Sequence, residues 1–344
     1  MVVIRFCLLA AVFTSLLPAQ APRIGVIDFY GRQHVAEAKL LKALGKQPGD
    51  ELPRSKGDAE EQLEQVEGVV RANLEAACCE DGKAILYIGV EEKGALHFDF
   101  NAPGAEAVLL PREIHDEYVA FLASVGLAVR GGDTAEDLSR GHSLMANPTC
   151  RAHQEKFLAL AEAELPRLRQ VLRSSFDEEH RAIAAYVIGY APRKEAVIDD
   201  LQYSLRDPDD TVRNNAMRSL AAIAILAQKQ PELELKISPT WFIESLNSII
   251  WQDRITAANT LVTLTETREN RIMTHLRERA LPAIREMAGW KHLPHALPGF
   301  ILAGRIAGFG ETEIQDLWKR GDRKTLLAKL SASDKPAKQP GRRK

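Results

Sequence analysis

Two short segments of this sequence carry side chains that could do chemistry: a His and Ser pair at 142–143 and an acidic run with one histidine at 113–117. A serine hydrolase presents its nucleophile in a Gly-x-Ser-x-Gly turn after a strand, because this turn exposes the hydroxyl group. Ser143 is correctly spaced from the first glycine, but Met145 replaces the second one and no strand is predicted before it. We therefore expect a loop whose His142 and Ser143 cap the helix after Asn147, and we expect no catalytic residue.

The acidic run contains the possible metal ligands Glu113, His115, Asp116 and Glu117. Zinc requires three or four ligands that converge on one point, whereas adjacent residues of a helix point in different directions. The sequence also lacks a His-Glu-x-x-His motif. We therefore predict no metal site and no cofactor.

The cysteines allow at most one disulfide bond once the expected signal segment, which contains Cys7, is removed. Cys78 and Cys79 are adjacent, and adjacent cysteines form a strained ring when they bridge one another. A bridge would therefore join Cys150 to Cys78 or to Cys79. The alternative is that all three are buried, unreactive thiols.

The elements around these residues are organised by a repeated helical pattern in the second half of the chain. Asp207 is a good N-cap and Pro208 suits the first position of a helix. The following apolar residues fall on one helical stripe, which must pack against neighbouring helices. Similar patterns begin at Asp177, which is 32 positions before Asp209, and again at Arg254. These segments resemble HEAT repeats, and the resemblance implies a solenoid of stacked helix pairs that offers a surface for binding.

The acidic and basic positions of this pattern are expected to form a structural ladder. An Asp at one inter-helix turn of a solenoid would meet the Arg of the adjacent repeat, and such a pair would fix the stacking register. A ligand site is the alternative. Asp253 directly precedes its arginine and therefore stands out of register with the other acids. The residues of the predicted ladder are Asp177, Arg181, Asp209, Arg213 and Arg254.

The first 20 residues have the outline of a signal peptide. One positive charge precedes an apolar run at 6–17, and small residues suitable for cleavage follow it. We expect an exported protein of the periplasm or cell envelope that loses its first 19 to 21 residues. An uncleaved membrane anchor is the alternative. The last segment, 331–344, is predicted to be a disordered basic tail, because it is rich in basic residues and has few apolar ones.

Residues 22–100 are predicted to fold as a small α+β domain with the order strand, helix, helix, strand, strand. Together with Gly31 after the first strand and the glycines at 45 and 49, this order resembles a polypeptide-transport-associated (POTRA) domain. The resemblance implies a three-stranded sheet whose edge accepts a partner strand. No sequence like that of an outer-membrane barrel follows, as it does in that family.

The predicted fold class is mainly α: a small α+β POTRA-like (β-α-α-β-β) domain, a linker at 101–110 with few contacts across it, and an α-solenoid of HEAT-like helix pairs at 111–330. The net charge of −2 argues against a nucleic-acid partner. Membrane association is expected only through an uncleaved signal or the basic tail.

The predicted function is that of an exported, non-catalytic scaffold that binds protein partners. The alternative is an enzyme or small-molecule-binding protein with a site between the two domains. Convergence of His142, His153 and carboxylates in a deep cleft would favour that alternative.

Overall fold

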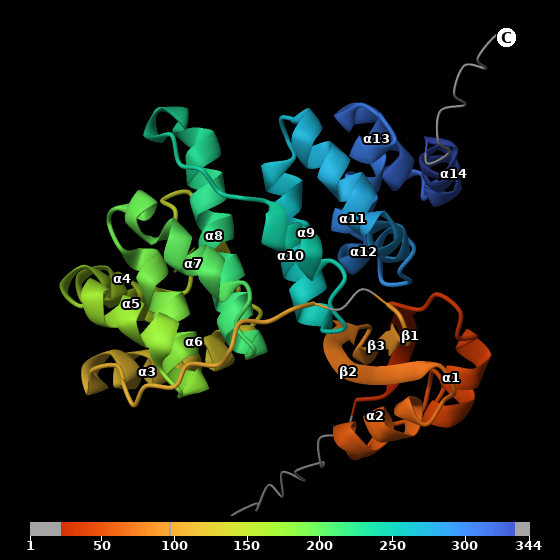
Figure 1. Ribbon diagram of the computed structural model, residues 1–344, viewed down its shortest axis with the longest axis horizontal. Helices are drawn as coiled ribbons and strands as arrows, with labels where there is room; N and C mark the ends of the chain where they lie inside the picture. Colours follow the sequence, from red (N-terminus) through yellow and green to blue (C-terminus); the bar gives the residue numbers. More distant parts are fainter. Residues whose placement is uncertain (1–21, 96–97, 334–344) are drawn as a thin grey trace, which may run out of the picture.

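The computed structural model describes residues 22–95 and 98–333, apart from the side chains of 78–80 and 333. Most of the chain is helical, and a small sheet lies near its N-terminus (Figure 1). The expected signal peptide and residues 334–344 of the expected tail lie outside the described residues. In the described parts, no helix combines the length and the apolar character needed to cross a membrane.

The N-terminal domain is a three-stranded sheet with two helices on one face. Its elements follow the predicted order: β1 (Ile24–Tyr30), α1 (Glu37–Leu44), α2 (Lys56–Glu64), β2 (Val69–Glu80) and β3 (Lys83–Glu92). The strand order is β1-β3-β2, with β1 parallel and β2 antiparallel to β3. Buried apolar residues of α1 and α2, such as Leu40 and Leu63, pack on one face of the sheet.

Local sequence explains the ends of these helices. Gly45 adopts a left-handed conformation (φ 61°) that ends α1, which a residue without a Cβ does at little cost. Ser55 begins α2, because its hydroxyl oxygen accepts a hydrogen bond from the Asp58 amide.

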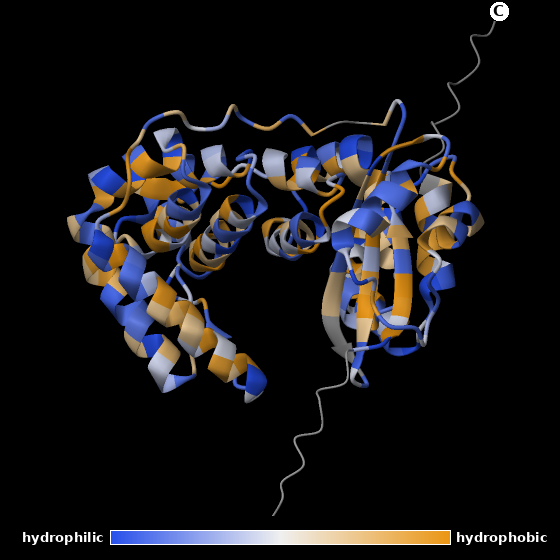
Figure 2. Ribbon diagram, turned by 90° about the horizontal axis from the view of Figure 1, so that it is seen from below, coloured by the Kyte–Doolittle hydropathy of each residue, from blue (hydrophilic) through white to orange (hydrophobic). Residues whose placement is uncertain are grey.

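The remainder of the chain is an array of helices that forms an arch, with the sheet at one end (Figure 2). From α5 to α12, consecutive helices pack in pairs, α5 with α6, α7 with α8, α9 with α10 and α11 with α12, and the second helices α6, α8 and α10 pack side by side. The helices are α3 (Arg112–Arg130), α4 (Pro148–Ala163), α5 (Leu165–Ser174), α6 (Glu178–Val187), α7 (Ile198–Ser204), α8 (Asp210–Lys229), α9 (Thr240–Ser245), α10 (Trp251–Leu264), α11 (Asn270–Ala288), α12 (Leu293–Ile306), α13 (Glu311–Lys319) and α14 (Arg323–Ser333). One buried apolar core runs through these helices.

The structure differs from local sequence patterns at three places. Residues 134–137 resemble a capping pattern and predict a short turn of helix, but β4 (Glu136–Asp137) pairs with β5 (Leu144–Met145). Pro282 and Pro298 predict kinked or broken helices, but neither breaks its helix: Pro282 lies inside α11 and Pro298 inside α12. The tail was expected to begin at Ser331, but α14 continues to Ser333, and the Ser331 hydroxyl donates to the Leu327 carbonyl.

The second face of the sheet packs against the helical array, which contradicts the expectation of few contacts between the domains. The Tyr87 ring stacks on Trp251 with ring centroids 4.9 Å apart, and the Tyr30 hydroxyl donates to the Ile249 carbonyl at 2.7 Å. A Cβ on Gly89 would meet the Ile249 carbonyl oxygen, so this approach requires glycine. The sheet therefore shares a core with the array.

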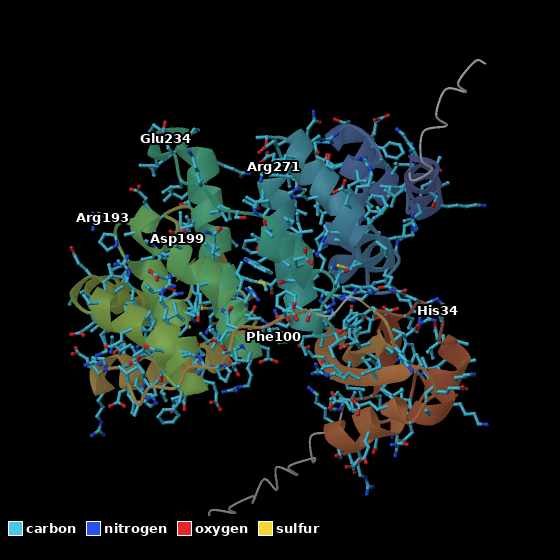
Figure 3. All side chains as sticks on the ribbon, in the orientation of Figure 1. His34, Phe100, Arg193, Asp199, Glu234 and Arg271 are labelled. Atoms are coloured by element: carbon cyan, nitrogen blue, oxygen red, sulfur yellow. The ribbon has the colours of Figure 1, made fainter. Side chains whose placement is uncertain are left out.

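The linker is also in contact with the helices as it runs from the sheet to α3 (Figures 1 and 2). The Asn101 amide donates to the Arg206 carbonyl at 2.7 Å, and the Glu106 amide donates to the Ser174 carbonyl at 2.8 Å. Phe100 (Figure 3), directly before the linker, stacks with the Arg213 guanidinium, whose Cζ lies 4.5 Å from the ring centroid. The two domains and the linker thus form one packed unit.

Candidate functional site

Three arginines occupy equivalent places in successive helix pairs. Each is the fourth residue after the N-cap of the second helix, and each donates to the carbonyl oxygen six residues before it. The residue six positions before each arginine is a Ser or Asp, whose side-chain oxygen accepts the amide two residues further on. The three bonds join Arg181 to Ser175 (2.9 Å), Arg213 to Asp207 (2.8 Å) and Arg254 to Ser248 (2.5 Å).

The arginines form a ladder of ion pairs, but with other acids than those expected. The pairs are Arg181 with Asp207 (2.8 Å), Arg213 with Asp253 (2.8 Å) and Arg254 with Glu286 (3.2 Å). The carboxylates of Asp177 and Asp209 instead accept amides of their own helices, from His180 and Val212 respectively. Asp253, expected to be out of register, is the partner of Arg213.

The middle rung is the most deeply buried one. The Arg213 and Asp253 side chains are 2% and 3% exposed. Burial raises the pKa of Asp253, and the Arg213 guanidinium opposes part of that rise. Removal of one partner of such a pair typically destabilises a protein by ~3–5 kcal/mol, because a buried charge is left alone. The predicted role of these residues in stacking register is thus consistent with their burial.

A cavity of about 310 Å³ lies on the face formed by the second helices of the pairs. Such a volume falls at the lower end of the range for small-molecule pockets. Its wall combines polar and apolar side chains from α6, α8, α10 and the loop between α3 and α4. The lining residues are Glu136, Leu138, His142, Ser143, Tyr186, Gly189, Tyr190, Arg218, Ser219, Ala221, Ile225, Gln252, Ile255, Thr256, Asn259, Thr260 and Thr263.

A buried hydrogen-bond network holds the loop at one side of this cavity. The Tyr190 hydroxyl donates to the Ser143 carbonyl at 2.8 Å and lies 3.0 Å from the Tyr186 hydroxyl. Gln154 donates to Tyr186 and to the Ser143 hydroxyl. The expectation that His142 and Ser143 cap α4 is wrong, because Asn147 alone accepts the first free amides of that helix.

His142 is buried, 8% exposed, beside a buried lysine. Its Nδ1 lies 3.3 Å from Lys194 Nζ, which also donates to the Gly189 carbonyl at 2.6 Å. Burial, and then the Lys194 charge, lower the pKa of His142 to about 4, while burial lowers the pKa of Lys194 to about 8. Neutral His142 therefore accepts at Nδ1 and carries its proton on Nε2, which has no hydrogen-bond partner among the described residues.

His153, which would have to converge with His142 in a catalytic site, is not part of this cavity. His153 Nδ1 is 2.6 Å from Glu117, which also pairs with Lys156. His142 and His153 therefore do not converge. His115 lies 3.3 Å from Asp116 and 3.6 Å from Glu179. Among the residues that the structure describes, no group of three or more His, Cys, Asp or Glu side chains is arranged to hold a metal ion.

Cys150 is a free, buried thiol that accepts a hydrogen bond from the Ser124 hydroxyl at 3.3 Å. The buried-thiol alternative therefore holds for Cys150. The side chains of Cys78 and Cys79 lie outside the described part of the structure.

The sheet has an outer strand, β2, whose edge amides are bonded to side chains. The Ala72 amide donates to the Glu64 carboxylate at 3.0 Å, and the Leu74 amide donates to Glu60 at 2.7 Å. Both acids belong to α2. On the same strand, Arg71 lines a cleft together with Asp210 of α8 and Ile250, so β2 lies beside the array.

Two further clefts lie at the boundary between the domains, but their main cationic groups are already engaged. Arg213 and Arg254 line one cleft each, and both belong to the ladder. Arg279, in the second cleft, pairs with Glu244 at 2.8 Å. The cavity beside His142 therefore offers the better-defined polar site.

Sequence reasoning missed most of the residues that form this cavity. One signal was present: Gln252, Thr256, Asn259 and Thr263 are spaced four, three and four residues apart, which places polar side chains on one side of α10. The sequence around Lys194 has no pattern that predicts a place beside this cavity. Lys194 contacts His142 only because the loop between α3 and α4 folds back against it.

A family model described as HEAT repeats matches residues 165–234, which run from α5 through α8. This segment contains the first rung of the ladder, Arg181 with Asp207, and the arginine of the second rung, Arg213. The resemblance to HEAT repeats is therefore supported for this segment. No curated protein matches the chain.

Proposed function

We propose that this protein is an exported, non-catalytic scaffold of the cell envelope that binds protein partners on the inner side of its arch and at the edge of its POTRA-like sheet. The observation that carries this proposal is the position of β2 beside the helical array: Arg71 of β2 lines a cleft together with Asp210 of α8 and Ile250, the N-cap of α10. A row of polar side chains on α10, from Gln252 to Thr263, faces the same inner side. The match to HEAT repeats supports this proposal, because stacked helix pairs form extended binding surfaces.

The β2 edge supports a specific mode of docking. An extended partner segment can add to an edge strand through backbone hydrogen bonds. At Ala72 and Leu74 the partner would replace the Glu64 and Glu60 carboxylates. The freed acids would then favour a partner strand with Lys or Arg side chains.

The export part of the proposal rests on the apolar run at 6–17 and the small residues after it. N-terminal sequencing of protein purified from the native cell tests it. We expect a mature terminus after residue 19, 20 or 21 in the envelope fraction. An intact Met1 in a cytoplasmic fraction would contradict export.

Site-specific photocrosslinking tests the binding surface. A photoreactive residue at Thr256, on the inner side, should crosslink to a discrete partner in the native cell. The matched position is Asp199, an exposed residue of α7 outside the cavity (Figure 3). Equal crosslinking at both positions, or at neither, would contradict the proposed inner surface.

A further inference from the structure

The outer side of α3 presents a group of apolar side chains to solvent. This helix is the first of the array, and its inner side packs against α4 and α6. Nine large apolar residues are exposed in the described part of the chain, and four of them lie on α3. They are Val119, Leu122, Leu127 and Val129, which are between 47% and 65% exposed. We propose that they form the interface of a symmetric dimer, in which the α3 helices of two copies pack side by side in antiparallel orientation.

The middle of α3 lacks the charged outer face that a surface helix normally carries. The segment 119–129 contains no charged side chain, and its outward positions include the small residues Ala123 and Gly126. Among the residues that the structure describes, and apart from the backbone of α3 itself, a Cβ on Gly126 would have only the Arg130 guanidinium within 4 Å. A second helix can therefore approach this side closely. A helix that is apolar on all sides is typically buried against a partner.

The charges at the two ends of this surface fit a second copy of the same helix. Asp116, Val119, Ala123, Gly126 and Arg130 are spaced three or four residues apart, so they follow one line along α3. In an antiparallel pair with its two-fold axis at Ala123, Asp116 of one copy lies opposite Arg130 of the other. The apolar residues of the two copies then meet between these charges. Two-fold symmetry forms this ion pair twice.

Both charged residues are free to take part. Arg130 is exposed, and it forms no ion pair with another residue in the part of the chain that the structure describes. Asp116 accepts from Arg112 at 3.1 Å and lies 3.3 Å from His115, but these contacts use different carboxylate oxygens. The Arg112 and Asp116 side chains are 93% and 58% exposed, and exposed pairs of this kind hold their partners weakly. The Asp116 carboxylate can therefore accept from the second copy.

A second copy fits this surface better than a lipid bilayer does. A helix that lies on a membrane typically carries Lys and Arg on its polar face, which attract anionic lipids. In α3 the residues next to the apolar surface include Glu113 and Asp116, which anionic lipids would repel.

Sedimentation equilibrium of the purified protein at a series of concentrations tests the proposal. We expect a monomer at low concentration and a dimer at high concentration. Ala123→Glu changes an exposed residue and places two like charges at the symmetry axis. It should raise the dissociation constant at least about tenfold, because opposed like charges are strongly unfavourable in an interface. Ala328→Glu makes the same change at an exposed position of α14 and should leave the dissociation constant unchanged.

Exchange of the end charges tests the antiparallel register. Asp116→Arg and Arg130→Asp should each raise the dissociation constant roughly tenfold, because each creates two repulsive pairs. The double variant should recover most of the wild-type affinity. The proposal would be overturned by a monomer at every concentration, by a dimer that Ala123→Glu leaves unchanged, or by a double variant that is no better than the single ones. A monomer that binds phosphatidylglycerol vesicles through this face would overturn it in favour of a lipid surface.

Discussion

The Arg254 guanidinium lies 4.5 Å above the centre of the Tyr30 ring, so the last arginine of the helical ladder touches the first strand of the sheet. Its ion-pair partner, Glu286, also accepts the Gly31 amide at 3.0 Å. Stacking of the helices and docking of the N-terminal domain therefore share one charged cluster.

We predict that the ladder contributes more to stability than exposed ion pairs do. Arg213→Met should lower the free energy of unfolding by ~3–5 kcal/mol, because the buried Asp253 carboxylate loses its partner. Arg279→Met is the matched control: its pair with Glu244 is exposed, and its loss should cost only ~0–1 kcal/mol. Urea unfolding of both variants measures the difference. Equal losses would contradict a structural ladder.

Docking of the sheet on the array depends on Gly89. Gly89→Ala should destabilise the protein by ~1–3 kcal/mol, because its methyl group would meet the Ile249 carbonyl and the Tyr30 ring. Gly57→Ala in α2 has open space around the new Cβ and should stabilise by ~0.5–1 kcal/mol. Denaturant melts give these values, and proteolysis within 101–110 should become faster only in the Gly89 variant. A stable, protease-resistant Gly89→Ala protein would rule out the tight interface.

Stability should fall as the pH is lowered from about 6.5 to about 4. The pKa of His142 and that of His295 are each lowered to about 4 by burial, and next by the charges of Lys194 and His292 respectively. In this range the unfolded chain binds more protons than the folded one, so stability rises with pH and is lost as the pH falls. Urea unfolding at a series of pH values measures the slope. His295→Gln should reduce the slope, and an unchanged slope would show that this histidine is not buried in its neutral form.

The β2 edge should be protected by α2. In a Glu60→Ala/Glu64→Ala variant the amides of Ala72 and Leu74 lose their acceptors, so their hydrogen exchange should become faster. The amide of Asn73, which pairs with Gly89 of β3, is an internal control and should keep its rate. Unchanged exchange at Ala72 and Leu74 would show that the carboxylates do not cover the edge.

Local sequence patterns predicted much of the fold. The alternating strand segments and the glycines at 31, 45 and 49 predicted the order of the N-terminal elements. These features depend on residues near one another in sequence, which is why they were predictable.

The partners of the ladder arginines were not predictable in the same way. Asp207 was predicted as the N-cap of the helix that became α8, but Asp209 caps that helix, and the Asp207 carboxylate pairs with Arg181 of the preceding repeat. The docked sheet and the His142 cavity were missed for a related reason, because both join segments that are far apart in sequence. Tyr87 and Trp251, for example, are 164 positions apart and carry no mutual signal.

The central claim is that proteins bind on the inner side of the arch, and the affinity of a crosslinked partner for surface variants tests it most directly. Asn259→Trp places a bulky ring on the exposed inner side of α10, and Asp199→Trp places the same ring on α7, outside the cavity. We predict that the dissociation constant rises at least tenfold for Asn259→Trp and is unchanged for Asp199→Trp. Wild-type affinity of the Asn259 variant, or an equal loss in both variants, would contradict the account.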